Sequence, residues 1–405
     1  MKIAMIGQKG IPALYGGVER HVEELSIHLV SLGHFVFAYT RPWYEKESKI
    51  KNQKLKIYKG VNLISLPSIY TKHLDAITHT LFASIHALFQ NYDIIHYHGI
   101  GPSLLSWIPR FLKPKTKVIV TFHSRDTKHQ KWGWFARLIL TSGEWMSCKI
   151  PHQTITVSKA LQDYCKKRYG KETIYIPNGI TTQDNTFSKI DNLSLEEFNL
   201  EEKKYILMVS RLVRHKGVHY LIEAYKNLDP KLQANYKLVI VGGSVFTDDY
   251  VKFLKEKAKG NENIIFTGSQ SGKILETLFK GAYLFVLPSE DEGLSVAILE
   301  AMNYGIPVLA SDISGNMELV ENYGFYFKNK DANDLTRKLR YLIEHPEVLK
   351  IKAKNAKRFV LENYNWLRIS ERIEKIYAGV LIRKELIDWA KETIAVKTKL
   401  IESIL

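Results

Sequence analysis

Short, unbroken apolar runs alternate with amphipathic segments along the first half of the chain. The runs predict buried strands at residues 2–6, 34–39, 61–66, 94–97, 118–122 and 154–157. Between the first two runs, Val22, Leu25 and Leu29 recur at helical spacing in a segment that ends at Gly33. Because strand and helix patterns keep alternating, this half predicts a parallel, doubly wound α/β sheet.

The second half repeats the alternation. Its apolar runs predict strands at residues 205–209, 237–241, 263–266, 283–287 and 306–309. The polar segment 181–204, which lacks periodicity, is typical of a linker, and residues 335–405 predict nearly continuous helix. We therefore expect two Rossmann-like domains facing each other across a cleft, over residues 1–190 and 191–365. Helices over residues 366–405 would partly pack back on the first domain.

One stretch, residues 283–307, combines a strand, an acidic turn and a short helix. Ligands of open α/β sheets bind beyond the carboxyl ends of the strands, so the free N–H groups at the start of this helix predict an anion site. These groups belong to Gly293, Leu294 and Ser295. Glu292 and Glu300 flank them with acceptors for hydroxyl groups. Together these features suit a sugar phosphate.

The composition excludes several classes of protein. Of the 405 residues, 45% are apolar and 25% are charged, and no apolar run approaches the length of a membrane-spanning helix. The N-terminus resembles a strand rather than a signal peptide. Two cysteines, Cys148 and Cys165, cannot form a disulfide framework and fit a reducing compartment. We therefore expect a cytoplasmic protein.

The net charge of +16 is unevenly distributed. Residues 1–190 carry 26 Lys and Arg against 12 Asp and Glu, whereas residues 191–405 carry 32 against 30. The basic half predicts an anionic partner, which could be a membrane surface, a phosphorylated substrate or nucleic acid; a lysine-rich solvated surface would give the same count. Nucleic acid is disfavoured because no interleaved aromatic groups or known binding module accompany the charge.

Two pairs of residues could hold phosphate. Gly16 and Gly17 lie where the loop after the first strand meets its helix, which leaves helix N–H groups open to a ligand. Their spacing does not match the dinucleotide fingerprint, which counts against an oxidoreductase. Arg211 and Lys216 flank the loop after the first strand of the second half and suit a diphosphate.

Histidines and small polar residues follow other strands. His123 ends a buried strand, where it could bind or exchange a proton with a hydroxyl group. Together with His96 and His98 it raises the alternative of a metal site, but no nearby Cys or carboxylate ligand is evident, so we expect no metal. Ser158 and Asn178 occupy similar loop positions as candidates for hydrogen bonding to a ligand.

In this order and spacing, these residues resemble the retaining glycosyltransferases of family 4, the group 1 type with the GT-B fold. The most specific segment is residues 292–302, Glu-Gly-Leu-Ser-Val-Ala-Ile-Leu-Glu-Ala-Met. The common family pattern has Gly-Phe-Gly where this chain has Gly-Leu-Ser after Glu292. The resemblance runs from Met1 to about Tyr377. Residues 6–19 and 131–133 are similar to the subgroup that acts in surface-polysaccharide assembly.

The resemblance implies transfer of a sugar from a nucleotide-diphosphate sugar to an acceptor hydroxyl, with retained anomeric configuration and without a metal or other cofactor. It implies that Arg211 and Lys216 hold the donor diphosphate and stabilise it as the leaving group. Glu300 would hold the ribose hydroxyls, and Glu292 would contact those of the sugar. His123 would lie beside the sugar and the acceptor.

From the first domain, Gly17 would offer its backbone N–H to the diphosphate. The expected acceptor is a lipid-linked or polymeric glycan, met by the basic first domain in peripheral contact with the inner face of an anionic membrane. Two alternatives remain open. One is a sugar-nucleotide epimerase of the same fold, and the other, from a different class, is a basic nucleic-acid-binding protein.

Overall fold

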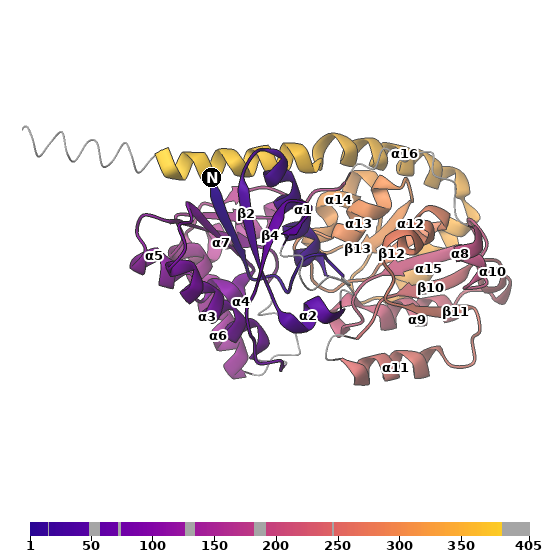
Figure 1. The fold of residues 1–405 in the computed structure, drawn as a ribbon. Helices are drawn as coiled ribbons and strands as arrows, with labels where there is room; N and C mark the ends of the chain where they lie inside the picture. Colours follow the sequence, from indigo (N-terminus) through magenta and orange to yellow (C-terminus); the bar gives the residue numbers. More distant parts are fainter. Residues whose placement is uncertain are drawn as a thin grey trace, which may run out of the picture.

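Two sheets organise the chain, one in each of two α/β domains that lie side by side (Figure 1). The computed structural model describes residues 1–14, 16–47, 57–71, 74–125, 134–181, 192–244 and 247–382. The predicted fold class is confirmed: both domains are built on parallel strands with helices between them.

The first sheet has the order β3-β4-β2-β1-β5-β6-β7-β8 and is parallel except for β3, which runs antiparallel to β4. Its strands are β1 (Lys2–Ile6), β2 (Phe35–Thr40), β3 (Ile57–Tyr58), β4 (Val61–Ser65), β5 (Ile94–His98), β6 (Lys117–Phe122), β7 (Gln153–Thr156) and β8 (Ile174–Tyr175). The helices are α1 (Gly17–Ser31), α2 (Pro42–Glu47), α3 (Asp75–Leu88), α4 (Ile100–Ser103), α5 (Trp107–Leu112), α6 (Trp134–Lys149) and α7 (Lys159–Tyr169).

The second sheet is parallel throughout, with the order β11-β10-β9-β12-β13-β14. Its strands are β9 (Tyr205–Val209), β10 (Lys237–Val241), β11 (Ile264–Gly268), β12 (Leu284–Leu287), β13 (Val308–Ser311) and β14 (Phe325–Phe327). The helices are α8 (Asn192–Glu196), α9 (Val218–Lys226), α10 (Pro230–Asn235), α11 (Asp248–Ala258), α12 (Gly272–Gly281), α13 (Val296–Asn303), α14 (Ser314–Tyr323), α15 (Ala332–Glu344) and α16 (Pro346–Asn363).

In each sheet the strand order reverses at the first strand of the domain. β1 lies between β2 and β5, and β9 lies between β10 and β12. Connections on the two sides of such a point turn in opposite directions, which leaves a crevice at the carboxyl ends of the strands. The two domains bring these crevices together, and this juxtaposition creates the candidate site.

The end of the chain returns from the second domain to the first. Residues 366–382 form a helix that lies along the top of the first domain in Figure 1, after α16 has passed over the second domain. Trp366, Ile369, Ile373 and Tyr377 are buried in the same apolar cluster as Val22 of α1. Burial of these side chains fixes the helix against the first domain.

The prediction of nearly continuous helix from residue 335 is confirmed as far as residue 382: the described residues leave the helix at His345, before the proline that starts α16, and at residues 364–365. Another sequence-based expectation was wrong in detail. The expected linker, residues 181–204, includes helix α8. The part of the predicted terminal helix beyond residue 382 lies outside the described residues. None of the helices in the described part of the chain has the length and apolar content that spanning a bilayer requires.

Candidate active site

A cleft of about 460 Å³ lies between the two domains. From the first domain it is lined by the loop after β1, the start of α1, the end of β6 and the loop after β8. From the second domain it is lined by the loops that follow β9, β10, β11 and β12 and by the start of α13. Most of the residues predicted from the sequence therefore meet in one place, because all of these loops follow the carboxyl ends of parallel strands.

Helix α1 begins at the cleft. Gly16 has a φ of 100°, which a residue with a side chain rarely adopts, and it precedes the first turn of the helix. A β-carbon on Gly17 would lie 3.6 Å from a methyl group of Val296, so α1 starts directly opposite α13. Two helix N-termini thus face the same space, and their unpaired N–H groups favour an anion there.

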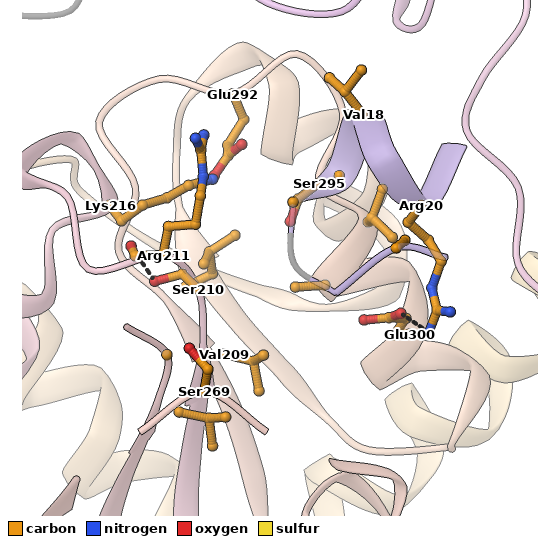
Figure 2. A pocket seen from close by; sticks show the side chains of 18 of the residues that line it. Val18, Arg20, Val209, Ser210, Arg211, Lys216, Ser269, Glu292, Ser295 and Glu300 are labelled. Atoms are coloured by element: carbon orange, nitrogen blue, oxygen red, sulfur yellow. Dashed lines mark hydrogen bonds and ion pairs between the residues drawn. The ribbon is translucent and has the colours of Figure 1, made fainter. Parts of the chain in front are cut away.

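The predicted cation pair lies on the opposite wall. Arg211 follows β9, and Lys216 ends a 3₁₀ turn (Arg214–Lys216) in the same loop. The Lys216 Nζ atom lies 2.5 Å from Oε1 of Glu292, and both side chains are largely buried. Within the described residues, the Arg211 guanidinium forms no side-chain hydrogen bond or ion pair, and Figure 2 shows it beside the Lys216–Glu292 pair. A diphosphate could therefore bind Arg211 without displacing a protein group.

Glu300 occupies the other end of the cleft, on α13. Its Oε1 atom lies 3.7 Å from Nη2 of Arg20, which reaches across from α1 (Figure 2). Burial raises the pKa of Glu300 above its ordinary value, and the positive charge of Arg20 opposes that shift. Sequence reasoning missed Arg20; the only available signal was its position one turn after Gly17 on the helix that opens at the cleft.

His123 lines the cleft directly after β6, as predicted, beside His98, which the sequence analysis grouped with it, and beside His21, which it did not. Its Nε2 atom lies 3.3 Å from Nδ1 of His98, and its ring lies 4.7 Å from that of His21 between centroids. Burial lowers the pKa of His21 to about 4 and lowers the pKa values of His98 and His123 well below their usual range. All three imidazoles are therefore neutral at physiological pH.

Asn178 connects this cluster to the second domain. The Nδ1 atom of His21 lies 2.9 Å from the Asn178 side-chain oxygen, and the Asn178 amide nitrogen donates to the Leu294 carbonyl at 3.1 Å. These two contacts place the remaining proton of neutral His21 on Nδ1. Its Nε2 atom is buried and has no hydrogen-bond partner within the described part of the chain.

Three of these side chains could in principle hold a metal ion. In the described residues, ligand atoms of His21, His98 and His123 lie within 4.8 Å of one another. His96, which the sequence suggested, faces Tyr377 through one ring nitrogen and Thr121 through the other. The three imidazoles are neutral ligands, so a divalent cation bound by them would keep its full charge in a buried site.

Other residues that were predicted to bind a ligand make contacts with backbone atoms of the protein. The Ser158 hydroxyl accepts from the Leu161 N–H as the N-cap of α7, and Ser158 is not among the described residues that line the cleft. Ser295 lines it, but its hydroxyl caps α13 by accepting from the Ile298 N–H. Gly293 packs so tightly against the backbone carbonyl of His123 that a β-carbon would overlap the oxygen.

Several further contacts hold the domains together around the cleft. Arg125 forms an ion pair of 2.5 Å with Asp291, in the acidic turn beside Glu292. At the start of α7, Glu318 of α14 accepts from the Tyr175 hydroxyl at 2.5 Å and from the Lys159 N–H at 2.9 Å. These contacts close the two domains on each other, and none of them was predicted from the sequence.

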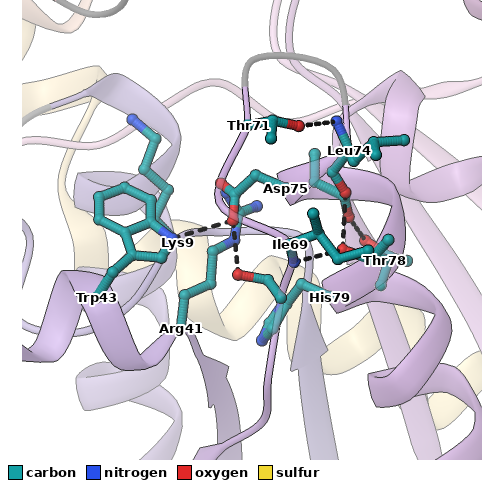
Figure 3. A network of polar contacts seen from close by, with 12 residues as sticks. Lys9, Arg41, Trp43, Ile69, Thr71, Leu74, Asp75, Thr78 and His79 are labelled. Atoms are coloured by element: carbon teal, nitrogen blue, oxygen red, sulfur yellow. Dashed lines mark hydrogen bonds and ion pairs between the residues drawn. The ribbon is translucent and has the colours of Figure 1, made fainter.

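A second polar network lies in the first domain, and its residues are not among the described residues that line the cleft. Figure 3 shows Arg41 paired with Asp75 at 2.5 Å, and the Trp43 indole N–H donates to the same carboxylate at 3.0 Å. Burial lowers the pKa of the neighbouring Lys9, and the positive charge of Arg211 adds to that effect while Glu19 opposes it.

Comparisons with known proteins agree with this architecture. Residues 15–184 match the family described as Glycosyltransferase Family 4, and residues 191–359 match the family Glycosyl transferases group 1. An uncharacterized glycosyltransferase of Methanocaldococcus jannaschii is 27% identical over 403 residues, which cover 93% of this chain and 98% of that protein.

The names of two further similar proteins describe the substrate or the bound ligands of those proteins. The N,N'-diacetylbacillosaminyl-diphospho-undecaprenol alpha-1,3-N-acetylgalactosaminyltransferase of Campylobacter jejuni is 30% identical over 254 residues, 60% of this chain and 65% of that protein. The structure of HepE from Anabaena in complex with UDP and glucose superposes with a TM-score of 0.74 at 19% identity, covering 94% of this chain and 100% of that one. With both halves matched and the fold shared, the chain belongs to the glycosyltransferases of family 4, group 1 type, with the GT-B fold.

Proposed function

We propose that this glycosyltransferase moves a sugar from a nucleotide-diphosphate sugar to a hydroxyl group of a lipid-linked or polysaccharide acceptor, with retained anomeric configuration and without a metal ion. The observation that carries the proposal is the composition of the cleft walls. Two cations, Arg211 and Lys216, face two helix N-termini, and carboxylates at Glu292 and Glu300 lie on either side. Donors for a diphosphate are thereby flanked by acceptors for sugar and ribose hydroxyls.

In this arrangement the diphosphate lies between Arg211 and the start of α1. Negative charge grows on the leaving diphosphate as the glycosidic bond breaks, and positioned cations stabilise that charge. Lys216 exchanges its contact with Glu292 for the phosphate, which leaves the carboxylate of Glu292 to accept from the sugar hydroxyls. His123, neutral and at the cleft wall, is positioned to hydrogen-bond the sugar or the acceptor.

Glu300 is the proposed ligand of the ribose. Because its carboxylate contacts Arg20 at 3.7 Å, the nucleoside enters beside an existing ion pair rather than into an apolar pocket. Beyond the ribose position, the cleft continues along residues 242–244 and 269–272, at the ends of β10 and β11, where the base would extend.

The proposed acceptor rests on two observations. The name of the Campylobacter relative describes an undecaprenol-linked acceptor. The first half of this chain, which forms the acceptor side of the cleft, carries 26 Lys and Arg against 12 Asp and Glu. A phosphorylated lipid carrier at an anionic membrane matches that charge, and we place the protein at the inner membrane face as a peripheral protein.

A screen of nucleotide sugars tests the function directly. Each candidate is incubated with the protein, and thermal stabilisation and release of nucleotide diphosphate are measured. We expect one donor class to stabilise the wild type and to be hydrolysed slowly without an acceptor, and the Arg211→Ala variant to lose both effects. Conversion of the donor to an isomer that remains nucleotide-linked would instead establish an epimerase, and no response to any donor would contradict the proposal.

A further inference from the structure

Three neighbouring helices of the first domain expose apolar side chains on the face that points away from their sheet. On α3, the exposed residues Leu81, Ile85 and Phe89 recur every four positions and form one stripe. Ala83 and Ala87 of the same helix are buried in the core cluster with β1 and β5. The outward stripe is therefore not needed to hold α3 on the sheet.

The stripe continues onto α5 and α6. Trp107, Phe111 and Leu112 are exposed on α5, and Leu138 and Trp145 are exposed on α6. α3 packs against α5 and α4, and α4 packs against α6, so the three helices form one layer. In Figure 1 this layer lies on the opposite side of the first sheet from the C-terminal helix.

The most exposed side chains gather where α3 and α5 end. Phe89, Phe111 and Leu112 are 81%, 61% and 63% exposed. They are close in space because the Lys113 ammonium donates to the Leu88 carbonyl at 2.9 Å, which joins the two helix ends. Side chains of this kind, left in water, mark a surface that docks on something apolar.

Cations surround this apolar cluster. Arg110 lies over the Phe111 ring at 5.7 Å and donates to the Ile150 carbonyl, directly after the end of α6. Lys115 and Lys149 are exposed and lie shortly before β6 and β7, at the amino-terminal ends of these strands. Arg110 lies in the last turn of α5, Lys115 follows that helix, and Lys149 ends α6, so the positive charge lies at the same helix ends as Phe111 and Leu112.

Exposed carboxylates are missing from the three helices. Their sequences contain two acidic residues, Asp75 and Glu144, and both are buried. Asp75 pairs with Arg41, and Glu144 accepts from the hydroxyls of Tyr164 and Tyr169. The three helices themselves therefore present apolar and cationic groups without an exposed carboxylate. Beyond the end of α3, Asp93 is exposed, and its carboxylate accepts from the Lys2 N–H at 2.7 Å.

We propose that this layer, α3, α5 and α6, is the surface through which the protein docks on an anionic lipid bilayer. Phe89, Phe111 and Leu112 insert at the interface, and the surrounding cations pair with lipid phosphates. This inference rests on the proposed function, because docking on a bilayer would bring the enzyme to a membrane-borne acceptor. None of the three inserted residues lines the cleft, so a bilayer on this face leaves the cleft open to the donor.

The charge distribution favours a bilayer over a second copy of the chain. A two-fold dimer through this face would place the same cations against themselves. Such like-charge contacts are unfavourable, and the three helices offer no exposed carboxylate to relieve them. A bilayer of anionic phospholipids supplies both the apolar phase and the complementary charge.

The test is sedimentation with vesicles of phosphatidylcholine, alone or mixed with phosphatidylglycerol. We expect the wild type to bind the mixed vesicles and the triple variant F89S/F111S/L112S to bind at least about 100-fold more weakly, because insertion is lost. K115Q/K149Q should weaken binding to the mixed vesicles by about 25-fold at low salt, about fivefold for each charge. The matched control F253S/I351S/L361S removes three exposed apolar side chains of the second domain and should bind as the wild type does.

Three outcomes would overturn the proposal. They are absence of wild-type binding to the mixed vesicles, equal binding by the wild type and the first triple variant, or a wild-type dimer in solution that is absent in this variant.

Circular dichroism confirms that each variant is folded. Hydrolysis of the nucleotide sugar in solution is measured in parallel and should be unchanged in all variants. If the first triple variant loses vesicle binding but hydrolyses the donor normally, the result supports the docking surface. If the wild type binds vesicles but hydrolyses no donor, the result contradicts the transferase proposal alone.

Discussion

The ammonium group of Lys216 lies 2.5 Å from a carboxylate oxygen of Glu292, with both side chains largely buried. Before the donor binds, the proposed phosphate ligand and the proposed sugar ligand therefore neutralise each other. This pairing avoids the cost of burying either charge alone. It also means that donor binding must replace one partner of the pair.

Replacement of Glu292 by Gln should strengthen binding of the nucleotide diphosphate but slow transfer of the sugar. The amide cannot compete with phosphate for Lys216, so affinity for the nucleotide diphosphate should improve. Transfer should fall by about 100-fold or more, because the charged acceptor for the sugar hydroxyls is lost. Calorimetry with the diphosphate and single-turnover transfer measure the two effects, and a parallel loss of both would show that Glu292 is needed for the shape of the loop instead.

Arg211 and Glu300 should be required for transfer but not for folding. Arg211→Ala removes the diphosphate ligand, and Glu300→Gln removes the charged ribose ligand, so each should lower transfer by at least about 100-fold. The controls are Arg214→Ala, in the same loop but exposed, and Glu321→Gln, exposed on α14. Full activity in both active-site variants, with thermal melting unchanged, would falsify the assigned roles.

A methyl group at Gly293 should separate the domains. The β-carbon that Gly293→Ala adds would overlap the His123 carbonyl oxygen, so the acidic turn must shift away from the first domain. A displacement of about 1 Å at a reacting centre can cost about 100-fold in rate, and this variant should lose transfer on that scale. Gly101→Ala is the control, because a β-carbon there has no neighbour within 4 Å. Equal activity of the two variants would argue against close domain contact during transfer.

Acid should destabilise the protein through the buried histidines. Burial lowers the pKa of His21 from 6.5 to about 4, so between these values the unfolded chain binds a proton that the native protein does not. The free energy of unfolding should therefore fall by about 1.4 kcal/mol for each pH unit below the unfolded-state pKa, per histidine held neutral. Urea denaturation of the wild type and of His21→Gln at several pH values measures the slope, which should be shallower in the variant.

Removal of metal should leave transfer intact. The proposed stabilisation of the leaving group uses Arg211, Lys216 and helix N-termini, none of which needs a divalent cation. Dialysis against EDTA, followed by metal analysis and a transfer assay, should give an active, metal-free protein. Stoichiometric zinc that is lost in His21→Gln together with activity would instead assign His21, His98 and His123 as a metal site.

The sequence by itself determined the fold class and most of the cleft residues. Three strands, Lys2–Ile6, Tyr205–Val209 and Lys237–Val241, appear in the structure with the predicted bounds, because a short apolar run between polar segments favours a buried strand. The order of β and α segments then fixes parallel sheets, and parallel sheets bring the loops after their strands to one edge. Local pattern was therefore sufficient to place His123 at the carboxyl edge of the first sheet, and Arg211 and Glu300 at that of the second.

Only the tertiary structure decided which groups meet across the cleft. The contacts of Arg20 with Glu300, of Arg125 with Asp291, and of Asn178 with Leu294 join residues of the chain 280, 166 and 116 positions apart. The local sequence pattern cannot predict such pairs, because they depend on how two separately folded domains are docked. The use of Ser158 as a helix cap and the outward apolar layer of α3, α5 and α6 also depend on packing, since the sequence pattern alone does not show which face of a helix is left without a partner.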